Sequence, residues 1–308
     1  MRRSLNLARA LPLLLLLLAL ASPAWAFQTR VVTIPSATMR QSFAATVVLP
    51  DAYVRGNRGG GRRNTPAERF PAVYVLHGSG GDHTDWTANT RIGELADRYH
   101  VILVMPDGGR ESWYLDSPFE KGSRYETFVG KEVVSYVDAH FRTIATKRAR
   151  AITGLSMGGF GALRIALDRP DAFGAAGSIS GAVDPRACDD EPRIDHVFGD
   201  RTRHPSFWNR SAIVESALTF AYAQMDLTID CGTDDTLVGS NRTLHERLVA
   251  LGVPHDYAER PGGHTWDYWA NAIRYQVLFF ASSFQRSGYA FRPRTDVAGR
   301  VGIAPRAG

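Results

Sequence analysis

Short runs of apolar residues alternate along the chain with segments whose apolar residues recur at helical spacing. Segments 125–141 and 157–167 have the helical pattern. Five apolar runs predict buried strands, at residues 72–76, 101–105, 149–153, 175–180 and 226–231. Because strands that alternate with helices are typical of a parallel sheet, we expect an α/β fold with a mostly parallel central sheet and helices on both of its faces.

The ends of this pattern differ from its centre. Residues 30–34 and 41–49 alternate between apolar and polar side chains, which predicts two early antiparallel strands. The segment that follows, 55–66, is rich in glycine and arginine and is expected to be a mobile, solvated surface loop, the alternative being a basic loop that holds an anionic substrate. No internal repeat is visible, and residues 27–284 are predicted to form one domain.

The second half of the chain predicts a cap and a tail. Residues 183–224 contain several prolines and a short predicted helix near 212–220, so we expect a small cap there. The last helix begins near Trp266 and is expected to end near Phe284. The remainder, 285–308, is rich in glycine, proline and arginine and predicts a disordered tail.

The first 26 residues have the pattern of a secretory signal. Arg2 and Arg3 precede an apolar stretch that is short for a membrane span, and Ala24-Trp25-Ala26 fits a signal-peptidase site. Cleavage before Phe27 leaves 282 residues and lowers the formal charge from +5 to +2. We therefore expect a secreted or periplasmic protein, with no stable membrane insertion after cleavage and no nucleic-acid partner.

Only two cysteines are present, Cys188 and Cys231, which excludes a disulfide-rich scaffold. An oxidising compartment permits a disulfide between them, but a buried free thiol at the end of the 226–231 strand is equally reasonable. The histidines lack the spacing of a zinc site, so we expect neither a metal nor a cofactor.

Gly154-Leu-Ser156-Met-Gly158 carries the strongest chemical signal. It has the G-x-S-x-G pattern between a predicted strand and a predicted helix, the context in which this pattern forms a nucleophile elbow. Small residues are needed at both glycine positions because the turn is sharp and the serine backbone is strained. Ser156 is thus a candidate nucleophile, and the N–H group of Met157 points toward an oxyanion formed there.

Candidate partners for this serine follow in the chain order Ser, Asp, His that the fold requires. The 226–231 strand runs into a turn with two adjacent carboxylates, Asp234 and Asp235. Further on, two glycines precede His264 and can deliver its imidazole to Ser156. Upstream, the 72–76 strand ends in His-Gly-Ser-Gly-Gly, where the second backbone donor of an oxyanion hole is expected.

These motifs resemble the esterase D branch of the α/β-hydrolases, the putative-esterase family that includes S-formylglutathione hydrolases, tributyrin and feruloyl esterases, and mycolyltransferases. The resemblance covers roughly residues 30–284 and rests on motifs that occur in the family's order: Val75 to Gly78, Asp85-Trp86, Ser112 to Tyr114, Gly154 to Gly159, Cys231 to Asp235, Pro261 to His264 and Trp266 to Trp269. It implies the α/β-hydrolase fold, to which the 183–224 segment adds a small cap. Within the resemblance, Ser156 matches the nucleophile, His264 the base and Asp235 the acid. The N–H groups of Ser79 and Met157 match the oxyanion hole.

The resemblance implies a serine esterase that hydrolyses short-chain acyl, aryl or sugar esters through an acyl-enzyme, and the N-terminal pattern adds that it is secreted. The alternatives are an acyltransferase of the mycolyltransferase type and a non-catalytic binding module with the same fold.

Two groups of aromatic residues each permit two interpretations. Trp113 and Tyr114 either line a substrate pocket or pack in the core, and the aromatic residues 266–269 either form a wall of the site or anchor the His264 loop.

Overall fold

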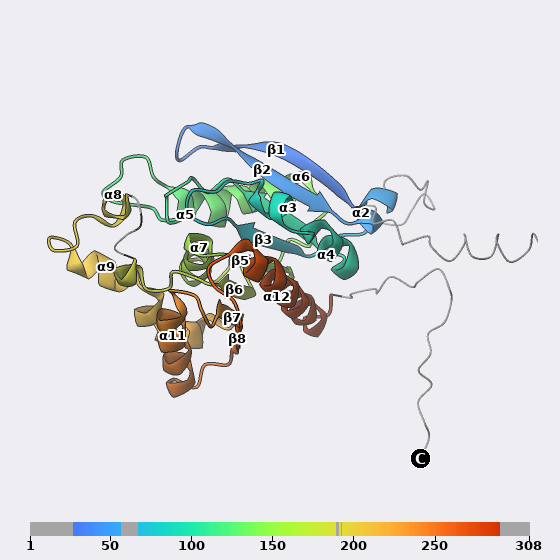
Figure 1. Cartoon of the computed structure of the whole chain (residues 1–308). Coiled ribbons are helices and arrows are strands. Elements are labelled where there is room, and N and C mark those ends of the chain that lie inside the picture. The colour runs from blue at the N-terminus through green and yellow to red at the C-terminus, as the bar shows by residue number, and fades with distance from the viewer. Residues whose placement is uncertain (1–26, 57–66, 189–190, 192, 290–308) are drawn as a thin grey trace, which may run out of the picture.

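An eight-stranded sheet runs through the centre of the structure in the strand order β1-β2-β4-β3-β5-β6-β7-β8 (Figure 1). The computed structural model describes residues 27–56, 67–188, 191 and 193–289. The strands are β1 (Gln28–Ser36), β2 (Gln41–Leu49), β3 (Ala72–Leu76), β4 (Ile102–Pro106), β5 (Arg150–Gly154), β6 (Ala175–Ile179), β7 (Asp226–Gly232) and β8 (Asp256–Arg260). The predicted α/β class is confirmed.

The sheet is antiparallel at one end and parallel elsewhere. β1 pairs with β2, and β2 with β4, in antiparallel fashion, whereas all other neighbours are parallel. Every residue of β3, β4, β5 and β6 is buried, as expected for strands covered on both faces. Successive residues point to opposite faces, so Tyr74 packs into one apolar cluster and Val73 and Val75 into the other.

Different helices cover the two faces of the sheet (Figure 1). One face is packed by α3 (Asp85–Asn89), α4 (Ile92–Tyr99) and the long helix α12 (Trp266–Arg286). The other face carries the remaining helices outside the cap: α2 (Asp51–Gly56), α5 (Tyr125–Thr127), η2 (Phe128–Val133), α6 (Val134–His140), α7 (Met157–Asp168) and α11 (Val238–Ala250). The short helix η3 (Lys147–Ala149) leads into β5.

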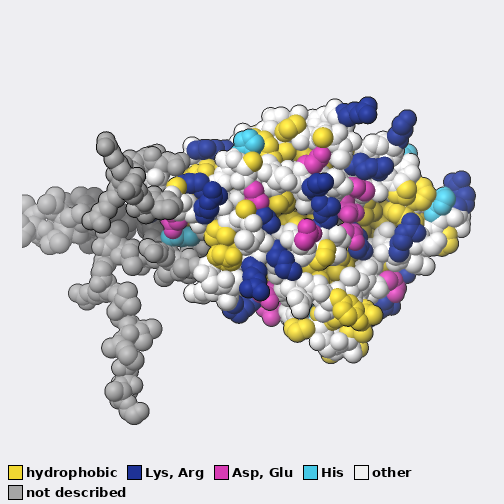
Figure 2. All heavy atoms as spheres, turned by 180° about the vertical axis from the view of Figure 1, so that it is seen from behind, with side chains coloured by type: hydrophobic (Ala, Val, Ile, Leu, Met, Phe, Trp, Pro, Cys, Tyr) yellow, Lys and Arg dark blue, Asp and Glu magenta, His cyan; other side chains and the backbone are white. Residues whose placement is uncertain are grey.

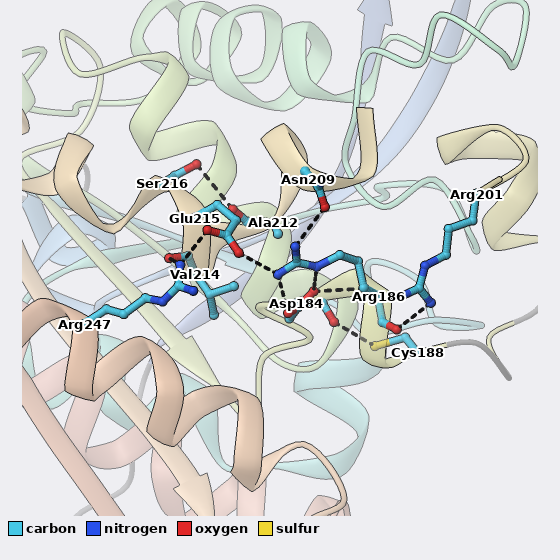
Figure 3. A network of polar contacts seen from close by, with 10 residues as sticks. All are labelled: Asp184, Arg186, Cys188, Arg201, Asn209, Ala212, Val214, Glu215, Ser216 and Arg247. Atoms are coloured by element: carbon cyan, nitrogen blue, oxygen red, sulfur yellow. Dashed lines mark hydrogen bonds and ion pairs between the residues drawn. The ribbon is translucent and has the colours of Figure 1, made fainter. Parts of the chain in front are cut away.

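The predicted cap region consists of short helices joined by loops. They are η4 (Pro185–Ala187), α8 (Ile194–Phe198), α9 (Pro205–Ser211), η5 (Ile213–Ser216) and α10 (Ala217–Ala223). Arg186 on η4 donates hydrogen bonds to the neighbouring Asp184, to Asn209 on α9 and to Glu215 on η5, and so joins η4 to two other helices of the cap (Figure 3). Arg247 on α11 donates to the same Glu215 at 2.6 Å, so this region is tied to the helix that follows the Asp235 turn.

Several elements differ in detail from the prediction. The helix expected at 125–141 contains the π-helical turn η2, the helix expected near 212–220 is divided into η5 and α10, and α12 extends to Arg286. Strand β8 was not foreseen, because its side chains are mostly polar and only partly buried. Both cysteines are free and buried. The predicted signal segment 1–26, most of the 55–66 loop and residues 290–308 lie outside the described residues.

The face opposite the one seen in Figure 1 carries interspersed positive and negative side chains, with small groups of apolar side chains between them (Figure 2). Within the described ranges, no helix is both long enough and apolar enough to cross a membrane.

Candidate active site

Ser156 lies in the turn between β5 and α7 with a strained backbone. Its φ and ψ angles are 54° and −120°, a conformation that L-residues rarely adopt. The flanking glycines allow the close approach that this turn requires. A Cβ on Gly154 would lie 2.5 Å from the carbonyl oxygen of Gly158, and a Cβ on Gly158 would lie 2.4 Å from that of His77. The sequence therefore forms the sharp elbow that its glycine spacing predicts.

Three side chains that are distant in sequence meet at the carboxyl edge of the sheet. Oγ of Ser156 lies 2.9 Å from Nε2 of His264. Nδ1 of His264 lies 2.9 Å and 3.1 Å from the two carboxylate oxygens of Asp235. With Nδ1–H donated to this carboxylate, Nε2 of the neutral ring carries the lone pair that faces the serine hydroxyl. The arrangement matches that of a nucleophile, a base and an orienting acid.

Asp235 is held in its ionised form. Its side chain is fully buried, whereas that of His264 is 31% exposed. Burial raises the pKa of this carboxyl, but hydrogen bonds from His264 and from the Leu237 N–H outweigh burial and hold the pKa below its ordinary value. The adjacent Asp234 instead uses its backbone N–H to bind the carbonyl of Gly262 at 3.0 Å, which joins the acid turn to the histidine loop.

Aromatic side chains support the histidine loop and the elbow. Trp269 packs edge-on against the His264 ring with 4.9 Å between ring centroids, and it also contacts Trp266. These contacts agree with both interpretations of residues 266–269, as a wall of the site and as an anchor of the His264 loop. Trp113 and Tyr114 are almost completely buried, so they belong to the core. Tyr114 nevertheless reaches the site's framework, because its hydroxyl donates to the His77 carbonyl at 3.0 Å.

The two backbone N–H groups assigned to the oxyanion hole lie in the loop after β3 and in the elbow itself. Ser79 follows β3, and Met157 is the first residue of α7. In the part of the chain that the structure describes, neither N–H donates a hydrogen bond to another residue. The N–H of Met157 also lies at the positive end of the α7 dipole. Both groups are thus free to donate to a ligand.

His77 is a residue of the site that the sequence reasoning did not identify. Its ring is 1% exposed, its Nδ1 lies 2.8 Å from the carbonyl of Gly78, and its Nε2 accepts from the N–H of Gly108 at 2.9 Å. Burial lowers its pKa, which keeps the imidazole neutral. His77 therefore fastens the Ser79 loop to the loop after β4, and the only signal for it was the histidine that begins the His-Gly-Ser-Gly-Gly segment.

Metal-ligating side chains do not converge at this site. Among the residues with described positions, no group of three or more His, Cys, Asp or Glu side chains is arranged to hold an ion. Thr46 Oγ1 lies 2.8 Å from Nδ1 of His83, so this histidine next to the Ser79 loop has a local partner.

A serine on a strand-to-helix elbow, with a histidine and an aspartate on later loops of a mostly parallel sheet, defines the α/β-hydrolase fold. A family model described as "Putative esterase" matches residues 36–280. The chain belongs to this family and is a carboxylic ester hydrolase.

Individual relatives agree with this assignment. An acetyl esterase of Caldicellulosiruptor saccharolyticus is 32% identical over 224 residues, which are 69% of this chain and 84% of the relative. An esterase of Mycobacterium tuberculosis is 29% identical over 248 residues, and the match spans 71% of this chain but only about half (52%) of that longer protein. The solved structure of a ferulic acid esterase superposes with a TM-score of 0.71 at 25% identity, covering 84% of this chain and all of that one.

Proposed function

We propose that this protein is a serine esterase that uses Ser156, His264 and Asp235 as its catalytic triad. The observation that carries the proposal is the 2.9 Å separation of Ser156 Oγ from an imidazole whose other nitrogen is bound to a buried carboxylate. A general base must lie within hydrogen-bond reach of the proton that it removes, and this geometry satisfies that requirement.

The reaction follows in two halves. Nε2 of His264 takes the hydroxyl proton as Oγ of Ser156 attacks the ester carbonyl, and the N–H groups of Ser79 and Met157 stabilise the oxyanion. The imidazolium then gives its proton to the departing alcohol oxygen, which leaves an acyl-enzyme. Water loses a proton to His264 and attacks the acyl carbon. Oγ leaves with that proton, and the carboxylic acid is released. Asp235 orients the ring and stabilises its cationic form throughout.

We infer that the substrates are short-chain acyl, aryl or sugar esters. The names of two relatives, an acetyl esterase and a ferulic acid esterase, support this range. Kinetics on 4-nitrophenyl esters from acetyl to laurate, together with methyl ferulate and an acetylated sugar, will define the preference. The same reactions with added glycerol or sugar distinguish hydrolysis from acyl transfer. Dominant formation of a new ester would identify an acyltransferase, and failure to react with any of the esters would contradict the proposal.

We further propose that the protein is exported and begins at Phe27 after cleavage. The support is the sequence pattern of residues 1–26 alone: arginines, a leucine-rich stretch and a small-x-small motif. N-terminal sequencing of protein recovered from the periplasm or medium should read Phe27 first. Protein that starts at Met1 and sediments with membranes would contradict export and indicate an uncleaved anchor.

A further inference from the structure

A pocket lined by charged side chains lies outside the triad. Its volume is about 450 Å³, within the range of small-molecule sites. Its walls come from four segments that lie at the same end of the molecule in Figure 1: the turn between β1 and β2, the loop after β4, residues 120–123 with 125, and the residue before α8. The mechanism proposed above uses none of its side chains.

This pocket adjoins the loop that carries Ser79. The N–H of Gly80, the next residue, donates to the carbonyl of Arg110 at 2.7 Å. A Cβ built on Gly80 would lie 3.8 Å from a guanidinium nitrogen of Arg110, so that side chain lies directly beside the loop. Arg110, which lines the pocket, therefore lies beside the residue that follows the assigned oxyanion-hole donor Ser79.

The pocket has a surplus of positive charge. Four cationic side chains and two carboxylates line it. Arg193 forms ion pairs with both carboxylates, at 3.2 Å from Glu111 and 2.9 Å from Glu120. The other three cations, Arg40, Arg110 and Lys121, form no ion pair within 4 Å and no side-chain hydrogen bond in the described part of the chain, although the charge of Arg110 also acts on Asp85.

Unpaired cations around a concave surface concentrate positive potential there and attract anions. A neutral donor adds to them. The hydroxyl of Tyr125 lines the pocket, lies against Gly109 and makes no hydrogen bond to another described residue. Burial, with a further rise from the carboxylates of Asp107 and Glu120, raises the pKa of this hydroxyl, which keeps it protonated and able to donate. Guanidinium, ammonium and hydroxyl donors together suit anionic oxygen atoms.

We propose that this pocket is an anion-binding subsite that receives a carboxylate carried by the ester substrate. The inference rests on the proposed esterase function and narrows it to esters of dicarboxylic acids or of carboxylate-bearing alcohols and phenols. Such an ester places its scissile carbonyl at Ser156 and its carboxylate near Arg40, Arg110 and Lys121.

The test uses two pairs of esters, and the two members of each pair differ by one negative charge. 4-Acetoxybenzoate and 4-acetoxybenzamide place the charged or neutral group on the leaving side, and 4-nitrophenyl hemiglutarate and its terminal amide place it on the acyl side. The wild-type enzyme should prefer the anionic member of at least one pair in kcat/KM. The double variant Arg40→Gln/Lys121→Gln should reduce that preference about twofold to tenfold, the range expected for two exposed ion pairs.

A matched control removes two charges elsewhere. Lys131 and Arg148 are exposed, lie outside the pocket and form no ion pair within the described ranges. Lys131→Gln/Arg148→Gln should keep the wild-type preference, which excludes an effect of net charge alone. Added salt should weaken the wild-type preference because it screens exposed charges. Equal ratios for the wild type and Arg40→Gln/Lys121→Gln in both pairs would overturn the subsite.

Binding separates this proposal from the esterase proposal. Calorimetry with Ser156→Ala measures whether 4-acetoxybenzoate and hemiglutarate esters bind without turnover, and the same measurement in the Arg40→Gln/Lys121→Gln background tests the pocket. Charge-dependent binding would support the subsite even if the wild type hydrolysed no ester. Hydrolysis of neutral esters without any charge-dependent binding or preference would leave the esterase intact and remove the subsite.

Discussion

The hydroxyl of Ser156 is the group on which the proposed chemistry depends. Replacing it with a hydrogen in Ser156→Ala removes the nucleophile and leaves the buried surroundings nearly unchanged. We expect kcat to fall on the order of 10⁴-fold or more, as in other triads, with an unchanged thermal transition. Steady-state kinetics on 4-nitrophenyl acetate measure the loss. The control is Ser282→Ala, which removes a hydroxyl from the partly exposed side of α12 and should keep full activity.

Retention of more than a few per cent of the activity by Ser156→Ala, in a preparation free of wild-type enzyme, would exclude this serine as the nucleophile.

The two adjacent aspartates provide an internal comparison. Asp235 is bound to His264, whereas no side-chain hydrogen bond or ion pair joins Asp234 to another described residue. Asp235→Asn should therefore lower kcat roughly 10²-fold or more relative to Asp234→Asn, because the amide does not stabilise the cationic imidazole. Circular dichroism melting curves of both variants check that the fold is kept. A larger loss for Asp234→Asn would mean that the acid is assigned to the wrong residue.

At the scale of the element, the elbow depends on glycine where β5 meets α7. Gly158→Ala would place a methyl group 2.4 Å from the His77 carbonyl and 2.7 Å from the Leu76 carbonyl, which are backbone atoms with little freedom to move. We expect a loss of about 1–3 kcal/mol in the free energy of unfolding, together with low activity, because the elbow and the Ser79 loop move apart. Urea unfolding and kcat measure the two effects.

Gly239→Ala is the matched control on a helix without crowding. Nothing lies within 4 Å of its added Cβ in α11, so the substitution should leave activity unchanged and stabilise the protein by about 0.5–1 kcal/mol. Similar effects of the two substitutions would show that the close approach at Gly158 does not constrain the elbow.

At the scale of the whole molecule, one carboxyl makes stability depend on pH. Burial raises the pKa of Glu126 from 4.5 to about 7, with a further rise from Asp168 and Asp116 that Arg164 and Arg169 oppose. Between these two pH values the folded protein keeps a proton that the unfolded chain has lost, so stability falls as pH rises through that window. Above pH 7 the full loss of stability that Glu126 causes is reached.

Glu126→Gln removes this penalty. The variant should be more stable than the wild type at pH 8 by about 1 kcal/mol, an amount reduced for the partial exposure of the side chain, and nearly equal to it at pH 4. Thermal unfolding at both pH values tests the difference. Glu246→Gln, an exposed carboxylate on α11, should change stability at neither pH. An equal gain for Glu126→Gln at pH 4 and pH 8 would show that the effect is not protonation.

The sequence by itself determined the α/β class and most strands of the sheet. Fully apolar strands such as β3 and β4 are recognisable because both of their faces are buried. Strand β8 escaped prediction for the opposite reason, since it lies at the sheet edge and keeps polar side chains. The sequence also indicated Ser156, Asp235 and His264 as candidates. The elbow and the glycine-rich turns are local features, so their motifs can be recognised from consecutive residues.

Only the tertiary structure decided what these residues contact. Ser156 and His264 are 108 positions apart, and their 2.9 Å separation exists because parallel strands bring their carboxyl ends to one edge of the sheet. The same packing brought the His77 ring to the N–H of Gly108 and gathered Arg40, Arg110 and Lys121 around one pocket. No local pattern marks such groups, because side chains from separate loops converge only when the whole sheet is assembled.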